Sequence, residues 1–186
     1  MNRTLKTTLG GIALATAVAV AAPAFSKVIV GGQAMFQSKT IVQNAVNSAD
    51  HTTLVAAVKA AGLVDTLNQK GPFTVFAPVN AAFSALPSGT VETLLKPENK
   101  GQLTKVLTYH VVPGRLTFLK LQKMVKKGKG KARLKTAAGG TLIAMANGPR
   151  NIVIKDANGG TANINVYDVL QSNGVIHSID KVLLPK

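Results

Sequence analysis

The sequence predicts a single domain of the α+β class, with short helices crowded into its first half and a meandering sheet in its second. Apolar residues recur at helical spacing from Ile41 onward. After Val111, apolar and polar residues alternate, and Asn-Gly pairs separate the runs as hairpin turns do. The chain shows no regular succession of strand and helix and no internal repeat, so we expect neither a doubly wound sheet nor a repeat array.

The predicted helices are short because turn-forming residues interrupt them. Asp50, His51 and Thr52 offer capping groups before one helix, and Gly62 ends it. Asn80 is predicted to cap another helix. We expect helices at 41–46, 54–58, 63–67, 80–86, 91–95 and 102–109, whereas residues 119–125 fit a helix or a strand.

The predicted strands carry β-branched and aromatic residues between turns. In one of them, at 132–136, the alternation directs Arg133 and Lys135 to solvent. In the last, alternation places His177 among apolar neighbours, which favours a hydrogen-bonded core histidine over a ligand. We expect strands at 73–76, 111–112, 132–136, 141–145, 152–155, 162–166 and 175–184.

The first residues have the pattern of a secretory signal peptide. A short positive region is followed by an uncharged apolar run from Leu9 to Ala22 and by a small-residue cleavage site. We therefore expect residues 1–24 to be removed and the mature chain to begin at Phe25, with a flexible lead-in over 25–39 and one domain over 40–186. The apolar run is too short to span a bilayer, so the mature protein should have no transmembrane anchor. The predicted location is the periplasm, the cell surface or the extracellular space.

The positive charge is concentrated in one segment of the chain. The sequence has 22 basic and 7 acidic residues, for a formal net charge of +15. Residues 99–155 contain 13 of the bases and no acid. This segment is interpreted either as a solvated surface or as a face that binds polyanions. The candidate polyanion-binding residues are Arg115, Lys120, Lys123, Lys126, Lys127, Lys129, Lys131, Arg133 and Lys135.

The candidate partners of this basic face are polyanions that an exported protein would meet. Acidic polysaccharide, lipopolysaccharide and acidic surface protein all fit an exported basic protein. Specific nucleic-acid binding is not expected, because Tyr109 and Phe118 are the aromatic residues of the segment and base stacking needs more.

The chain has no arrangement of residues typical of an enzyme. It contains no cysteine, and its three histidines are far apart in the sequence. His177 and Ser178 are neighbours on a predicted strand and therefore point to opposite faces. Gly128–Lys131 lacks the spacing of a phosphate-binding loop. We predict no catalytic activity, no cofactor and no metal site.

Three ordered stretches carry a resemblance to a known family. Residues 71–83 (GPFTVFAPVNAAF), 107–114 (LTYHVVPG) and 173–185 (NGVIHSIDKVLLP) are similar to the signatures of the fasciclin domain. The resemblance covers roughly residues 40–186, with a small departure at Val79, where the family commonly has threonine. It implies a fasciclin-like β-sandwich wedge with short helices packed on one edge.

The resemblance also implies a function, with an alternative. Fasciclin domains are mostly adhesion or matrix modules, so we expect an exported module that attaches to acidic surface polymers or protein partners through its basic face. The family also implies a protein-interaction site at Tyr109 and His110, against the alternative that one is buried and the other exposed. Algal relatives imply a second candidate function, a carrier of an apolar ligand such as a carotenoid or a lipid.

Overall fold

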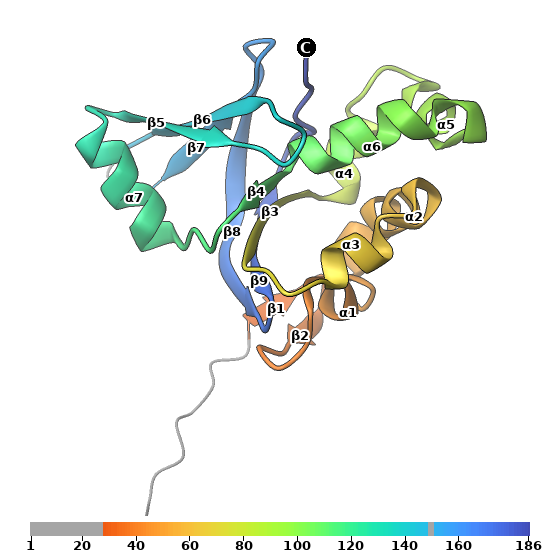
Figure 1. Cartoon of the computed structure of the whole chain (residues 1–186), viewed down its shortest axis with the longest axis horizontal. Coiled ribbons are helices and arrows are strands. Elements are labelled where there is room, and N and C mark those ends of the chain that lie inside the picture. Colours follow the sequence, from red (N-terminus) through yellow and green to blue (C-terminus); the bar gives the residue numbers. More distant parts are fainter. Residues whose placement is uncertain (1–27, 149–150) are drawn as a thin grey trace, which may run out of the picture.

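A computed structural model describes residues 28–148 and 151–186. Helices and strands are both present, which confirms the α+β class (Figure 1). The strands are β1 (Val28–Val30), β2 (Gln33–Met35), β3 (Phe73–Pro78), β4 (Val111–Pro113), β5 (Lys131–Lys135), β6 (Thr141–Ala146), β7 (Ile152–Lys155), β8 (Thr161–Gln171) and β9 (Gly174–Ile179). The α-helices are α1 (Ile41–Ala45), α2 (Thr52–Ala61), α3 (Val64–Asn68), α4 (Asn80–Ser84), α5 (Thr90–Leu95), α6 (Lys100–Tyr109) and α7 (Phe118–Lys127).

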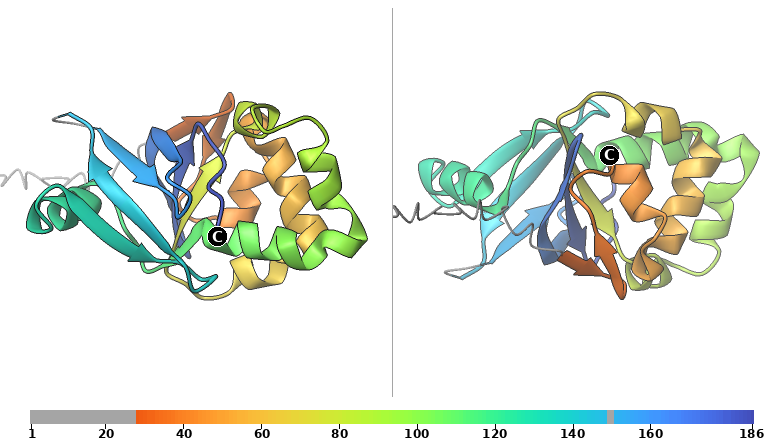
Figure 2. Two further views of the ribbon diagram at one scale, coloured as in Figure 1. Left: turned by 90° about the horizontal axis from the view of Figure 1, so that it is seen from above. Right: turned by 90° about the horizontal axis from the view of Figure 1, so that it is seen from below.

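The main sheet has seven strands in the order β4-β3-β9-β8-β7-β6-β5. β9 pairs in parallel with β3, and all the other neighbours are antiparallel. Helices α1 to α6 lie on one side of β3 and β9, whereas α7 lies alone at the far end, against β5 and β6 (Figures 1 and 2). This arrangement gives the domain two large apolar cores, beside a small third cluster of Ala82, Val106 and Val182.

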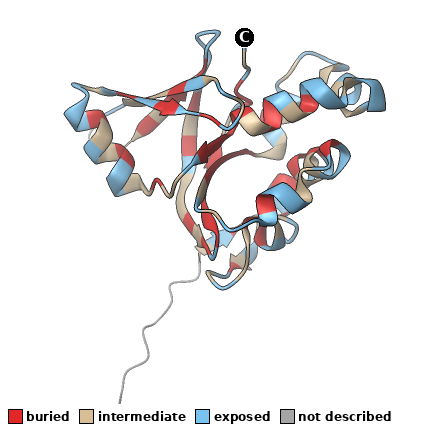
Figure 3. Cartoon of the chain, viewed as in Figure 1, coloured by how far each residue is buried: buried red, intermediate tan, exposed pale blue. Residues whose placement is uncertain are grey.

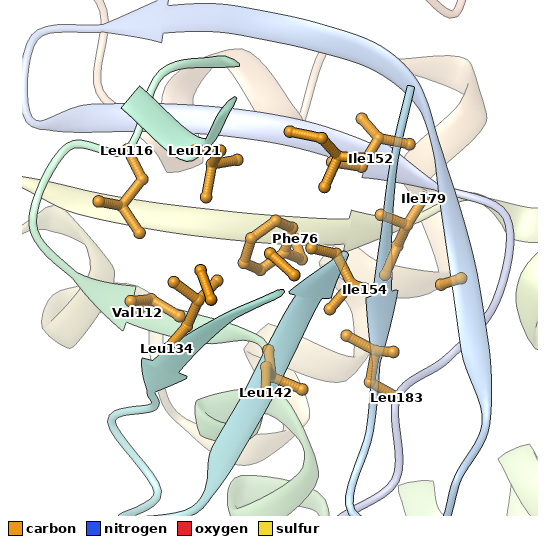
Figure 4. Packing of buried hydrophobic residues seen from close by; sticks show 14 of the residues in the cluster. Phe76, Val112, Leu116, Leu121, Leu134, Leu142, Ile152, Ile154, Ile179 and Leu183 are labelled. Carbon is orange, nitrogen blue, oxygen red and sulfur yellow. The ribbon is translucent and has the colours of Figure 1, made fainter. Parts of the chain in front are cut away.

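The first core fills the space between α7 and the curved sheet. Leu121 on α7 and Phe76 on β3 pack there with alternate residues of β5 to β8, such as Leu142 and Ile154 (Figure 4). All four side chains are completely or almost completely buried. Because successive strand residues point to opposite faces, the other residues of β5 and β6 point away from this core.

The second core lies between the helices and the other face of β3 and β9. Leu54 and Ala57 of α2, Leu107 of α6 and Val75 of β3 contribute to it. Every residue of β9 is buried, because the strand lies between the two cores (Figure 3). The expected placement of His177 in the core is confirmed.

Several expectations about single segments need correction. The lead-in predicted to be flexible forms the β1–β2 hairpin from residue 28 onward, and its Val30 and Met35 are buried in the second core. The ambiguous segment 119–125 is helical, as part of α7. The last strand ends at Ile179, five residues earlier than predicted. The signal peptide and the predicted cleavage before Phe25 lie outside the described residues.

Asn80 caps a different helix from the one predicted. It is the first residue of α4, but its Oδ1 accepts a hydrogen bond of 3.0 Å from the backbone N–H of Thr53, in the first turn of α2. Its amide donates to the carbonyl of Ala49. A capping residue from another part of the chain therefore fixes the start of α2.

Candidate functional site

Helix α7 carries four of the nine predicted polyanion-binding residues. Leu121 and Val125, one helical turn apart, face the first core and hold the helix on the sheet. Its start is fixed by two distant strands: Asp168 of β8 accepts a hydrogen bond of 2.8 Å from the Phe118 N–H, and His177 Nε2 donates to the Leu116 carbonyl over 2.7 Å. The exposed face therefore has a defined position, and it carries Lys120, Lys123, Lys126 and Lys127.

Strand β5 carries three more of these residues on one face. Lys131, Arg133 and Lys135 are exposed and alternate with buried Ala132 and Leu134. The sequence predicts this for Arg133 and Lys135, whereas the strand begins one residue earlier than predicted, at Lys131. Successive bases on this face are about 6.6 Å apart along the strand. Lys129 lies in the turn between α7 and β5. We call these eight residues the basic edge: Lys120, Lys123, Lys126, Lys127, Lys129, Lys131, Arg133 and Lys135.

The basic edge has two faces rather than one. The lysines of α7 and the bases of β5 point away from the core that the two elements share, so they lie on opposite sides of that layer. On the β5 side, Arg133 pairs with Ile143 of β6, which pairs with Lys155 of β7. Lys155 therefore extends the basic face across three strands, a contribution that depends on strand register and was missing from the prediction.

Arg115 does not belong to the basic edge. Its Nη2 donates hydrogen bonds to the carbonyls of Gln171 and Ser172, at 2.9 and 3.2 Å. It lines a separate polar cleft together with Lys70. The structure therefore places Arg115 apart from the other predicted bases, where it holds the β8–β9 turn in place.

Tyr109 and His110 are both buried, with exposed fractions of 1% and 2%. The Tyr109 hydroxyl donates to the Thr141 carbonyl at 2.9 Å and accepts from the Ala157 N–H at 3.0 Å. The His110 Nε2 accepts from the Leu183 N–H at 2.9 Å. These hydrogen bonds connect the end of α6 to the start of β6, to the β7–β8 turn and to the C-terminal residues. Neither side chain is therefore available at the surface for the predicted partner contact.

The three histidines have hydrogen-bonding roles inside the protein. Burial lowers the pKa of His51, His110 and His177, and for His110 it lowers the pKa to about 4, although backbone hydrogen bonds and nearby carboxylates partly oppose this. The His177 ring bonds the backbones of Leu116 and Asp168, whereas the Ser178 hydroxyl lies 3.2 Å from His51 Nε2. Within residues 28–148 and 151–186, no three histidines or carboxylates are grouped as metal ligands.

An apolar cavity lies within the second core. Its volume is about 290 Å³, and its walls come from α1, α2, α3, α6 and β3, together with Ala137 of the β5–β6 turn. Most of the lining is aliphatic, and Val46, Lys59 and Thr66 are exposed members that mark where it meets solvent. Sequence analysis could not locate this cavity, because its residues come from separate elements.

No helix within the described part of the chain is long and apolar enough to cross a membrane. The basic edge and the apolar cavity are the two candidate functional sites.

The comparisons with known proteins agree with the fold. Protein sll1483 of Synechocystis is 45% identical over 84% of this chain and 79% of its own length. The transforming growth factor-beta-induced protein ig-h3 of Sus scrofa is 38% identical over 71% of this chain, which corresponds to 17% of that longer protein. A solved FAS1 domain pair from the insect cell adhesion molecule Fasciclin I matches 78% of this chain and 51% of that chain, with a TM-score of 0.68 and 22% identity, which confirms the fasciclin-like wedge. The Fasciclin domain model matches residues 49–185, and the chain belongs to this family.

Proposed function

We propose that the protein is an exported adhesion or matrix-binding module that attaches to acidic surface polymers through its basic edge. The observation that carries this proposal is the position of the charge. Eight bases of one short stretch of chain are exposed on α7, the following turn and β5, and no acid occurs in the sequence between Glu98 and Asp156. Clustered charge of one sign creates a local field that attracts polyanions.

Two further observations support the proposal. The chain belongs to a family in which one solved relative is described as a cell adhesion molecule. Residues 1–24 have the pattern of an export signal. Because seven of the eight bases are lysines, which are flexible point charges, we expect salt-sensitive attachment with little selectivity among acidic polysaccharide, lipopolysaccharide and acidic protein.

The clustering of these bases also has a simpler explanation, and an experiment must distinguish it from polyanion binding. β5 is the last strand in the order of its sheet, and lysines on such a strand prevent pairing with other chains. They also increase solubility. These roles require charge but no partner, so the test must measure binding and must compare variants of equal net charge.

The experiment measures retention of the protein from Phe25 onward on an immobilised acidic polysaccharide over a salt series. In the edge variant, three exposed lysines of α7 are reversed to glutamate: Lys120, Lys123 and Lys127. In the control variant, three exposed lysines outside the basic edge are reversed: Lys70, Lys96 and Lys181. Thermal unfolding checks that both variants are folded.

We expect the edge variant to elute at clearly lower salt than the control variant, although both carry the same net charge. Equal elution of the two variants would show that the α7 face of the basic edge is not the site of attachment. Absence of wild-type retention at low salt would contradict the proposal altogether.

The apolar cavity supports a second candidate function, carriage of an apolar ligand. A concave, mostly aliphatic site is the usual form of a small-molecule site. The cavity lining includes Val42, Leu63 and Leu107 from three different helices. Organic extraction of the protein purified from its natural source should then yield a lipid or pigment in stoichiometric amount, and a clean extract would count against this candidate.

A further inference from the structure

We propose that the apolar cavity takes a single-chain anionic amphiphile, a fatty acid carboxylate, with its alkyl chain in the cavity and its carboxylate at Lys59. The inference rests on the second candidate function above and gives it a ligand class and an anchoring residue.

The size of the cavity favours a slim ligand. Its volume of about 290 Å³ lies at the lower end of the range of small-molecule sites, roughly 300–1,000 Å³. An unbranched hydrocarbon chain occupies little cross-section and can follow an irregular aliphatic wall. A bulky ring system requires a wider site, so the volume argues against the larger pigments.

The charges of the lining favour an anion. Among the described residues that line the cavity, Lys59 is the one lysine, and no arginine, aspartate or glutamate is present. His51 and His110 also line it, but burial lowers the pKa of both, so they are uncharged at neutral pH. A carboxylate would therefore meet a cation at Lys59 and no opposing charge in the wall.

The position of Lys59 suits a headgroup contact. The residue is exposed and lies in the last turn of α2, so its ammonium group reaches solvent while its alkyl stem can follow the cavity wall. A second base is close by, because the Lys100 Nζ lies 3.4 Å from where a side chain at Gly62 would begin, three residues beyond Lys59. Two lysine side chains therefore lie near the C-terminal end of α2, and one of them, Lys59, lines the cavity.

Lys59 also has a role that needs no ligand. A cation in the last turn of a helix is favourable on its own, because the C-terminal end of the helix dipole is negative. Stability measurements alone would not separate the two roles. The test must therefore compare ligands that differ only in headgroup charge.

The experiment displaces the neutral fluorescent probe N-phenyl-1-naphthylamine from the folded protein with three twelve-carbon ligands: dodecanoate, dodecanol and dodecyltrimethylammonium. An exposed ion pair contributes at most about 1 kcal/mol, which corresponds to a preference of about fivefold. At low salt, dodecanoate should displace the probe at about three- to fivefold lower concentration than dodecanol, and the cation should be the weakest.

Four variants test whether the preference for dodecanoate over dodecanol depends on Lys59. In Lys59→Met the preference for dodecanoate over dodecanol should disappear, and in Lys59→Arg it should persist. Lys96→Met, which removes an exposed lysine that does not line the cavity, should behave as wild type. Ala137→Trp, at an exposed position of the cavity lining, should weaken the binding of all three ligands.

The outcomes separate this inference from the function on which it rests. If the probe and all three ligands fail to bind, both the second candidate function and this inference fail. If dodecanoate and dodecanol displace the probe equally, or Lys59→Met keeps the preference, the cavity binds apolar ligands but the assignment of a carboxylate to Lys59 is wrong.

Discussion

His110 makes the stability of the domain depend on pH. Its Nδ1 donates to the Val106 carbonyl at 2.8 Å, and its Nε2 accepts from the Leu183 N–H at 2.9 Å. Burial lowers the pKa of His110 from 6.5 to about 4, and the Val106 carbonyl and Asp156 oppose this lowering only in part. A proton on Nε2 would also remove the acceptor for Leu183.

The sign and size of the effect follow from the two pKa values. Below pH 6.5 the unfolded chain binds a proton at His110, whereas the folded protein does not until about pH 4. The free energy of unfolding therefore falls as the pH falls through this window. For this residue the loss relative to pH 7.5 is about 2 kcal/mol at pH 5 and about 3 kcal/mol at pH 4.

The assay is urea unfolding at pH 7.5, 6 and 5, for the wild type and His110→Gln. Glutamine keeps one donor and one acceptor but does not titrate. The variant should therefore lose about 2 kcal/mol less than the wild type between pH 7.5 and pH 5. His51, His177 and all carboxylates are present in both proteins, so their contributions cancel in the comparison. If both proteins lose the same free energy over this range, the reasoning about His110 is refuted.

Three further predictions concern single residues with close contacts inside the fold, each measured by urea or thermal unfolding. Asn173→Ala should cost about 2–4 kcal/mol, because the side chain bonds the backbones of α1 and α3, and the exposed Asn158→Ala should cost less. Leu142→Ala should cost about 3–5 kcal/mol, since its side chain is completely buried in the first core; a loss under 1 kcal/mol would mean that the core there is loosely packed. Gly140→Ala should be destabilising despite the small change, because a Cβ there would lie 2.6 Å from the Tyr109 ring, and wild-type stability would contradict this contact.

Much of the fold could be predicted because its elements carry local signals. The alternation over residues 132–136 identified β5 and its solvent face correctly to within one residue, since a strand has a period of two. Residues 119–125 stayed ambiguous because the apolar side chains of α7 fit both periods, and contact with the sheet decides between them.

The candidate sites were harder to predict because their partners are distant in the sequence. The burial of Tyr109 depends on Thr141 and Ala157, which lie 32 and 48 residues away. Arg115 belongs to the basic segment of the sequence but bonds the β8–β9 turn, 56 residues further on. Likewise, Lys155 lies on the same face of the sheet as Arg133 only through the register of three strands.

The parallel pairing of β9 with β3 has a mechanical consequence. The C-terminal residues leave directly from β9, which is held on one side by β3 and on the other by β8. A force applied to the C-terminal end therefore acts along β9. The hydrogen bonds on both sides of this strand must then break together by shear rather than one at a time. The hydrogen bonds from the Leu183 and Leu184 N–H groups to His110 and Asp156 take up tension before β9 does. A module loaded from this end would resist extension through the centre of its sheet.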